Sequence, residues 1–239
     1  MGGKMTDEKH PGLHTQDVAY PGETDQVRAY LARPEGETRR PGVIVIHENK
    51  GLQPHIKDVT RRVASEGFLA IAPDALSPVG GTPEDVDQAR SLMRELDPAA
   101  TVKDLVAAVQ YLKTHPLSTG KVGCTGFCWG GGMTNQVAVH SPDLSAAVPY
   151  YGRQPDAQDV PQIKASMLLH YAGLDERINA GIPAFEKALV EASVEYEVYI
   201  YEGAQHAFNN DTSPTRYHPE AARLAWHRTI AFLKEKLKI

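Results

Sequence analysis

A glycine-rich segment, Gly-Phe-Cys-Trp-Gly-Gly-Gly at residues 126–132, constrains the fold more than any other part of the chain. The apolar run 121–125 precedes it, and the composition of residues 133–140 suits a helix, so the expected order is strand, tight turn, helix. The spacing G-x-C-x-G matches the nucleophile-elbow pattern G-x-S-x-G with sulfur in place of oxygen. So sharp a turn leaves no room for side chains beside the nucleophile, which accounts for the glycines.

The turn would place Cys128 at the N-terminus of a helix. There the helix dipole and the first amide groups favour a thiolate over a thiol, and they can also hold a developing oxyanion. The alternative is a glycine-rich strand-to-helix turn that carries a buried structural cysteine. The choice between the two depends on which side chains the rest of the chain supplies.

Length and composition predict a globular protein. The chain has 239 residues without internal repeats or a linker, which predicts one domain over residues 16–239 after a flexible tail, residues 1–15. A net charge of -5, with charges of both signs interspersed, gives no reason to expect nucleic acid or a membrane as partner. The first twelve residues resemble neither a secretory signal nor a membrane anchor. Two closely spaced cysteines, Cys124 and Cys128, are expected to be free thiols, which favours a cytoplasmic location.

Strand and helix patterns alternate along the chain. Right-handed crossovers between them predict an α/β fold, with a mostly parallel central sheet and helices on both faces. Thr82, Pro83 and Glu84 are expected to begin one of the helices, with Thr82 as N-cap. The expected strands are 17–20, 27–33, 43–47, 68–72, 121–125, 146–150, 166–172 and 196–201, and the expected helices are 56–66, 82–96, 98–115, 133–140, 182–192 and 219–236.

Two polar side chains follow later strands of the predicted sheet. Asp175 comes just after the strand 166–172, and His206 lies in the loop after the strand 196–201. The order Cys128, Asp175, His206 is that of nucleophile, acid and base in the α/β-hydrolase fold. An imidazole transfers protons near neutral pH, and a carboxylate fixes its tautomer, so we expect a catalytic triad. Asp175 is preferred to Glu176 because it comes first after the strand, and Cys124 is expected in the core.

An acidic residue, Glu48, directly follows the apolar strand 43–47. Its loop is the one that supplies the second oxyanion donor in hydrolases of this fold. A structural alternative pairs Glu48 with Lys50 or with an arginine. A metal site on His47, Glu48 and His55 is disfavoured, since His47 should point into the sheet and no H-E-x-x-H spacing exists.

With these motifs the chain resembles the dienelactone hydrolase (carboxymethylenebutenolidase) family, from about Val18 to the C-terminus. The resemblance implies that Cys128 attacks an ester or lactone carbonyl and forms a thioester, which water resolves with His206 as base. It also implies that Glu48 contacts the resting thiol and helps to deprotonate it. The backbone N–H groups of Asn49 and Trp129 would form the oxyanion hole.

The chain departs from that family at two positions. Members that act on dienelactone itself carry arginines that bind the substrate carboxylate, and the corresponding positions here are Val86 and Asn210. Other side chains could supply the cation, and several aromatic residues are expected near the pocket. The possible cations are Lys50, Arg90, Arg153 and Arg177, and the aromatic residues are Trp129, Tyr150, Tyr151 and Phe208.

The sequence therefore predicts a hydrolase of small carboxylic esters or lactones that uses Cys128, His206 and Asp175, with Glu48 as auxiliary base. It is expected to need no cofactor and no metal, and to act on a small-molecule substrate as a monomer or weak homodimer. The alternatives are a thioesterase or promiscuous esterase, and a non-catalytic member of the fold that binds a small molecule or protein. A redox-sensing role for Cys128 lacks a well-placed resolving cysteine.

Overall fold

The computed structural model describes residues 10–239. Residues 1–9 of the predicted flexible tail lie outside the described residues. The boundary predicted at residue 15 is wrong, because Leu13–Thr15 already belong to the first strand. The chain divides into two compact units, one running up to Val122 and including Ile239, the other spanning Gly123–Lys238. The prediction of a single domain stays a prediction.

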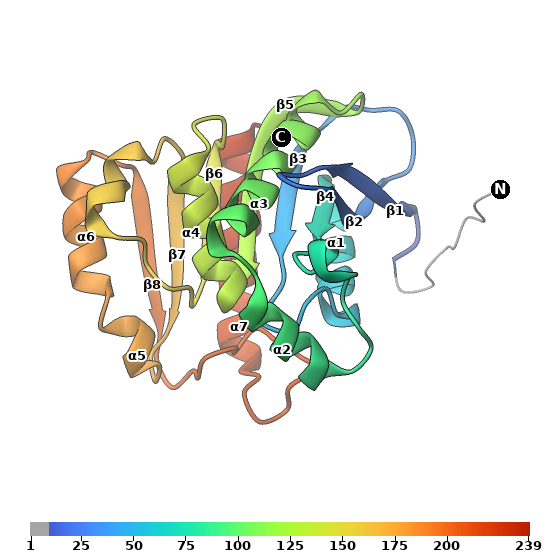
Figure 1. The fold of residues 1–239 in the computed structure, drawn as a ribbon. Coiled ribbons are helices and arrows are strands. Elements are labelled where there is room, and N and C mark those ends of the chain that lie inside the picture. The colour runs from blue at the N-terminus through green and yellow to red at the C-terminus, as the bar shows by residue number, and fades with distance from the viewer. Residues whose placement is uncertain (1–9) are drawn as a thin grey trace. The chain divides into compact units, whose positions relative to one another are not determined.

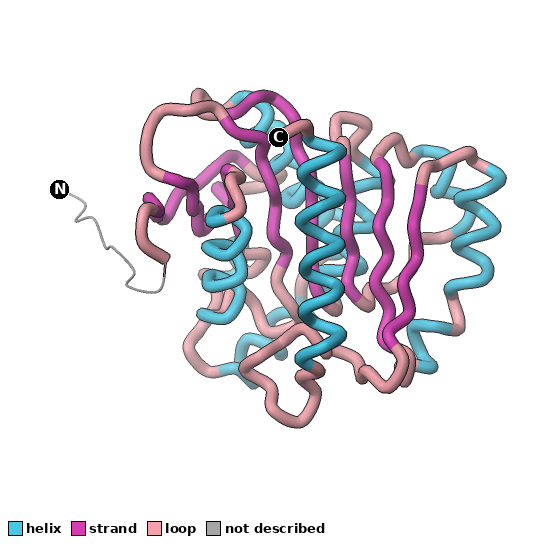
Figure 2. The backbone as a smooth tube through the Cα atoms, turned by 180° about the vertical axis from the view of Figure 1, so that it is seen from behind, coloured by secondary structure: helices cyan, strands magenta, loops and turns pink. Residues whose placement is uncertain are grey.

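The first unit combines an antiparallel edge with parallel strands. Its strand order is β1-β2-β4-β3; the pairs β1–β2 and β2–β4 are antiparallel, and β3–β4 is parallel. Figures 1 and 2 place α3 on one face of these strands and α1 on the other. The elements are β1 (Leu13–Pro21), β2 (Gln26–Pro34), β3 (Arg40–Ile46), α1 (Pro54–Ser65), β4 (Leu69–Pro73), the 3₁₀ helix η1 (Ser77–Val79), α2 (Val86–Glu95) and α3 (Pro98–Thr114), and β5 (Ser118–Phe127) begins in this unit.

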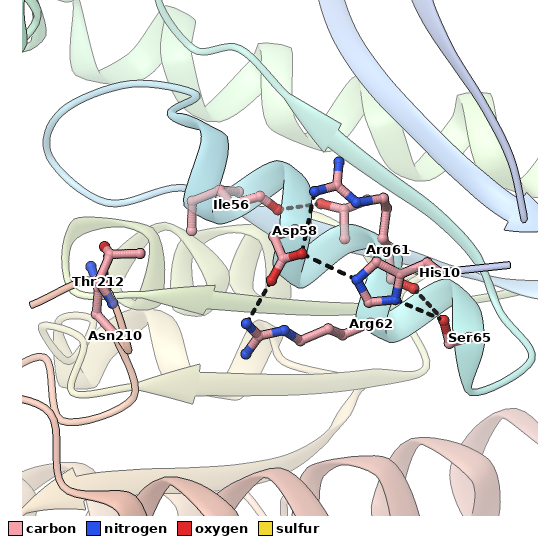
Figure 3. A network of polar contacts seen from close by, with 9 residues as sticks. His10, Ile56, Asp58, Arg61, Arg62, Ser65, Asn210 and Thr212 are labelled. Atoms are coloured by element: carbon pink, nitrogen blue, oxygen red, sulfur yellow. Dashed lines mark hydrogen bonds and ion pairs between the residues drawn. The ribbon is translucent and has the colours of Figure 1, made fainter. Parts of the chain in front are cut away.

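Close packing explains why β3 is apolar after Arg40. Its residues 43–46 are fully buried, and a Cβ at Gly42 would come within 2.9 Å of the Leu112 side chain of α3. On α1, the Asp58 carboxylate contacts the side chains of His10, Arg61 and Arg62 (Figure 3). The His10 contact attaches the start of the described chain to this helix.

The second unit contains only parallel strands. Their order is β5-β6-β7-β8, and each neighbouring pair runs parallel. Its elements after β5 are α4 (Trp129–His140), β6 (Ala146–Tyr150), the 3₁₀ helix η2 (Ala157–Gln162), β7 (Ser166–Ala172), α5 (Glu176–Asn179), α6 (Ile182–Glu191), β8 (Tyr196–Tyr201) and α7 (Pro219–Leu237).

Two glycines of β5 show that helices cover both faces of this unit. A Cβ at Gly123 would meet Leu233 and Leu237 of α7 at 3.0 Å, whereas a Cβ at Gly126 would meet Gly130 of α4. Figure 1 accordingly shows α4 in front of the strands, and Figure 2 shows α7 in front of them from behind. The predicted fold class, an α/β-hydrolase fold with a mostly parallel sheet covered by helices on both faces, is confirmed.

The predicted elements are present, but two helices start elsewhere than predicted: α4 begins at Trp129 and not at residue 133, and α2 begins later than Thr82. α2 begins at Val86, and its N-cap is Asp85, whose side chain accepts a hydrogen bond from the Gln88 amide. Thr82 does not cap it, because its amide and hydroxyl both donate to the Asp74 carboxylate at 2.8 Å. Within residues 10–239, no helix combines the length and apolar content needed to cross a membrane.

Candidate active site

The turn after β5 has the backbone expected of a nucleophile elbow. Cys128 adopts φ 58° and ψ -118°, a sparsely populated conformation for a residue with a side chain, and directly precedes α4. Its amide donates to the Tyr150 carbonyl at 3.1 Å, and its carbonyl accepts from the Gly132 amide at 3.1 Å. These bonds hold the residue in place, while its side chain remains partly accessible.

The glycines around Cys128 are required by backbone contacts. A Cβ at Gly126 would lie 2.2 Å from the Gly130 carbonyl oxygen, and one at Gly131 would lie 2.4 Å from the Tyr150 carbonyl oxygen. Gly152, just after β6, packs equally closely on Gly131. The start of α4 therefore lies directly against the end of β6, with no space for side chains between them.

The structure brings Asp175 and His206 together. Asp175 is the N-cap of α5, where one carboxylate oxygen accepts from the Ile178 amide at 3.4 Å. The other oxygen forms a short hydrogen bond with Nδ1 of His206, which leaves Nε2 as the second nitrogen of that ring. Backbone hydrogen bonds join the two loops, from the amides of Gly173 and Leu174 to carbonyls at the end of β8 and beyond it.

The dipeptide Tyr150–Tyr151 contacts both Cys128 and His206 of the predicted triad. Tyr150 accepts the amide hydrogen of Cys128, and the Tyr151 ring lies 5.0 Å from the imidazole of His206, centroid to centroid. Tyr151 is itself held by a 2.7 Å hydrogen bond from its amide to the His170 carbonyl. The end of β6 thus positions the elbow and the Asp175–His206 pair.

A buried hydrogen-bond network fixes this dipeptide from the side of α7. The Tyr150 hydroxyl lies 2.6 Å from the Thr229 hydroxyl, and His170 Nε2 lies 3.0 Å from the same oxygen. The His170 Nδ1 nitrogen faces the Tyr201 hydroxyl at 3.0 Å, which accepts from Arg228. Burial first, and the Arg228 charge second, lower the pKa of His170 to about 3, so this imidazole stays neutral.

Sequence reasoning missed this network. Its members come from β6, β7, β8 and α7, and Tyr150 is 79 positions from Thr229. The signal in the sequence is the polar His170 directly after the apolar run 167–169, and that signal does not identify a partner.

The second cysteine behaves as predicted for a core residue. Cys124 is fully buried in β5, and its sulfur contacts the Thr134 hydroxyl at 3.6 Å. Burial raises the pKa of its thiol to about 12. Both cysteines are free thiols, as expected, and Cys128 is the accessible one.

The first unit contains the predicted Glu48 loop. Glu48 is buried and forms an ion pair with Lys50, Oε2 to Nζ at 3.3 Å, which is the contact that the structural alternative predicts. Asn49 between them is exposed. His47 uses Nδ1 to donate to the Glu48 carbonyl and Nε2 to accept from the Ala75 amide, so both ring nitrogens are engaged. No group of three or more metal-ligating side chains occurs within residues 10–239.

The remaining predicted pocket residues separate into two groups. Phe208 is fully buried and packs against the rings of Tyr150, Tyr151 and Tyr201, so its predicted place in the pocket is wrong and it is a core residue. Tyr151 is also buried, with its ring against His206. Arg177 is exposed and lines a pocket of about 440 Å³ in the second unit.

The other predicted positions are also placed. Trp129, partly exposed, is the first residue of α4, so its amide lies at the positive end of the helix dipole. Val86 begins α2. The Asn210 side chain is buried and accepts from the amide and hydroxyl of Thr212, closing a local turn (Figure 3).

Comparisons with known proteins identify the family of this chain. The model of the dienelactone hydrolase family matches residues 27–237. A Yersinia pestis protein named "Putative carboxymethylenebutenolidase" is 33% identical over 94% of this chain and 91% of its own length. A protein of the same name from Saccharolobus solfataricus is 32% identical over 93% of this chain and 99% of its own.

Solved structures lead to the same family. One named "Putative Dienelactone Hydrolase", from Klebsiella pneumoniae, has a TM-score of 0.84 at 30% identity, over 93% of this chain and 99% of its own. A dienelactone hydrolase-like promiscuous phosphotriesterase from metagenomic libraries has the same TM-score at 25% identity, over 94% of this chain and 99% of its own. The chain thus belongs to the dienelactone hydrolase family and is a hydrolase that acts on carboxylic ester or lactone bonds.

Proposed function

We propose that the chain hydrolyses small carboxylic esters or lactones with Cys128 as nucleophile, His206 as general base and acid, and Asp175 as the group that orients His206. The observation that carries the proposal is the Asp175–His206 hydrogen bond, together with the left-handed backbone of Cys128 at the start of α4. The shared contact of Cys128 and His206 with Tyr150–Tyr151 supports it.

In the first half of the reaction the Cys128 sulfur attacks the carbonyl carbon, and Nε2 of His206 takes the thiol proton. The tetrahedral intermediate collapses to a thioester, and His206 returns the proton to the departing alcohol oxygen. In the second half a water attacks the thioester, giving its proton to His206. The C–S bond then breaks, the Cys128 sulfur takes the proton back from His206, and the carboxylic acid leaves. Asp175 orients the ring through its hydrogen bond to Nδ1 and stabilises the imidazolium.

Two further groups complete the proposed site. The amides of Trp129 and Asn49 would hold the oxyanion, and the position of Trp129 as first residue of α4 supports its part in this. Glu48 would act as auxiliary base on the resting thiol.

The proposed setting is the cytoplasm, with the chain acting as a monomer or weak homodimer; the two free thiols support a reducing compartment. A thioesterase or a promiscuous esterase is the second candidate. The metagenomic relative, whose name describes it as a promiscuous phosphotriesterase, favours testing substrates beyond carboxylic esters.

Single-turnover mixing with p-nitrophenyl acetate tests the proposal directly. The expected result is a burst of nitrophenol and an acetyl group that peptide mass mapping locates on Cys128. A panel of lactones, thioesters and one phosphotriester then defines the substrate class. Acetyl transfer to another residue, or turnover that persists in Cys128→Ala, would contradict the proposed nucleophile.

A matched pair of histidine variants tests the base. His206→Ala is expected to lower kcat by several orders of magnitude while the far-UV circular dichroism stays unchanged. His227→Ala is the control, because His227 is an exposed residue of α7 outside the proposed site. Near-normal turnover in His206→Ala would refute the role of His206.

A further inference from the structure

The loop that carries Glu48 and Asn49 is attached at both ends to the loop that follows β4. The first loop, residues 47–53, lies between β3 and α1, and the second, residues 74–82, lies between β4 and α2, all within the first unit. The proposed auxiliary base and one proposed oxyanion donor lie between the two attachment points. Hydrogen bonds at these points therefore decide where both groups lie.

His47 fixes the start of the loop. Its Nδ1 donates to the Glu48 carbonyl at 2.7 Å, and its Nε2 accepts from the Ala75 amide at 3.1 Å. Only a neutral imidazole offers one donor and one acceptor in this way. The ring is fully buried, and burial lowers the pKa of His47, which favours the neutral form that the two contacts need.

Thr82 fixes the end of the loop. Its hydroxyl oxygen accepts from the Leu52 amide at 2.8 Å and lies 2.8 Å from Oδ1 of Asp74. An amide can only donate, so the hydroxyl hydrogen must point to the Asp74 carboxylate. The position of that carboxylate therefore determines, through one hydroxyl group, where the Leu52 backbone lies.

The Asp74 carboxylate is itself held in place. It is buried, and besides the hydroxyl it accepts from the Leu76 amide at 3.0 Å and from the Thr82 amide at 2.8 Å. The Asp74 amide donates to the Arg28 carbonyl at 2.8 Å, which attaches this residue to β2. The Asp74–Thr82 pair is thus a rigid support that is built on the sheet.

The two loops approach each other too closely for a side chain at Gly51. This residue has φ 76°, in the left-handed region, and a Cβ there would clash with the Thr82 hydroxyl. Gln53 closes the same turn, because its amide donates to the Gly51 carbonyl at 2.9 Å and its side chain donates to the Lys50 carbonyl at 2.8 Å. The backbone directly after Asn49 is therefore fixed against Thr82.

From this arrangement we propose that the Asp74–Thr82 pair positions the Glu48 carboxylate and the Asn49 amide for catalysis. Thr82 and Asp74 are positioning residues, which act through the loop 47–53 and not on the substrate. This inference rests on the proposed function for the roles of Glu48 and Asn49, whereas the attachment of the loop does not. It also assigns a role to the Thr82 hydroxyl, which does not cap α2.

Two substitutions of Thr82 test the role of its hydroxyl. With enzyme in excess over p-nitrophenyl acetate, the limiting rate constant of nitrophenol release reports acylation alone. An unfolded fraction raises the enzyme concentration needed to reach this limit but leaves the limit itself unchanged. Thr82→Val should lower the limiting rate constant about 10- to 100-fold, since a displacement of about 1 Å can cost that much. Thr82→Ser, which keeps the hydroxyl, should stay within about threefold of the wild type.

Two buried aspartates of the first unit form a matched pair. Asp74→Asn places an amide where a carboxylate accepts from three donors, so it should lower the limiting rate constant as Thr82→Val does. Asp104 is also a buried carboxylate that accepts from a backbone amide, but its partner is Glu23, in the turn between β1 and β2. Asp104→Asn should leave the limiting rate constant within about twofold of the wild type.

Amide hydrogen exchange, followed by NMR, separates this inference from the proposed function. The Leu52 amide should exchange about tenfold faster in Thr82→Val than in the wild type, and the Glu23 amide is the reference that should not change. An acylation rate constant that Thr82→Val leaves unchanged, or that Thr82→Ser lowers as strongly, would overturn the inference. Faster Leu52 exchange in a protein whose wild type acylates no Cys128 would overturn the proposed function and the positioning role together, and would leave only a structural hydrogen bond.

Discussion

The hydroxyl of Thr229 is a hydrogen-bond partner of two buried side chains. It donates to the Ala225 carbonyl at 2.8 Å and accepts from the Tyr150 hydroxyl and from Nε2 of His170. All three side chains are fully buried. Thr229→Val keeps the shape of the side chain but removes these contacts.

The cost of this substitution follows from the donors left behind. Tyr150 loses its only described hydroxyl partner, and His170 cannot compensate by changing tautomer. If its proton moves to Nδ1, Nε2 becomes an acceptor with no donor opposite it. Each buried polar group left without a partner costs about 1–3 kcal/mol, so Thr229→Val should lower the free energy of unfolding by about 2–6 kcal/mol.

Two matched substitutions isolate this effect in urea unfolding followed by fluorescence. Thr114 and Thr60 make the same hydrogen bond to the carbonyl four residues earlier, at 2.8 and 2.7 Å, but neither hydroxyl has a second hydrogen-bond partner within residues 10–239. Thr114 is exposed and Thr60 is fully buried, so the pair also controls for burial. Thr114→Val and Thr60→Val should each change stability by less than about 1 kcal/mol. If Thr229→Val costs no more than Thr60→Val, the reasoning about stranded donors is wrong.

Three further outcomes follow from the site. Gly131→Ala should destabilise the protein and reduce turnover, because the added Cβ would lie 2.4 Å from the Tyr150 carbonyl oxygen. Gly132→Ala should stabilise the protein by about 0.5–1 kcal/mol, because the atom nearest to its added Cβ is 3.5 Å away. Thermal unfolding of the two variants compares these effects. His170 stays neutral down to about pH 3 while an unfolded histidine takes up its proton near pH 6.5, so stability should fall as the pH is lowered through this window; His170→Asn should reduce the slope measured by urea titration between pH 6.5 and 5 by about 1 kcal/mol per pH unit, and an unchanged slope would contradict the assignment. Iodoacetamide near pH 8 should modify Cys128 and spare Cys124, whose thiol has a pKa of about 12, and peptide mapping that finds Cys124 modified in folded protein would refute its burial.

Local patterns in the sequence were sufficient for the elements and for the pairing of Asp175 with His206. Periodicity and turn residues depend on near neighbours, and the order of strand-end residues limits which loops meet. Long-range contacts were not accessible in this way. The residues next to Thr82 in the sequence predict that it is an N-cap. Its hydroxyl instead donates to the Asp74 carboxylate, and the N-cap of α2 is Asp85.

Phe208 shows the same limit for the pocket. Its position two residues after His206 made it a natural pocket residue, yet it packs among tyrosines from β6 and β8. Whether an aromatic side chain near a catalytic loop faces solvent or core depends on the layer beneath it, and no local pattern specifies that layer.

The double role of Tyr150–Tyr151 has a consequence for thermal motion. Since the Cys128 amide and the His206 ring both contact this dipeptide, a displacement of the end of β6 carries both groups in the same direction. The change in distance between Cys128 and His206 is then the difference between two movements in the same direction, which is smaller than the change that two independent movements would give. Vibration of the strand as a whole can therefore be large while the spacing between sulfur and imidazole fluctuates little.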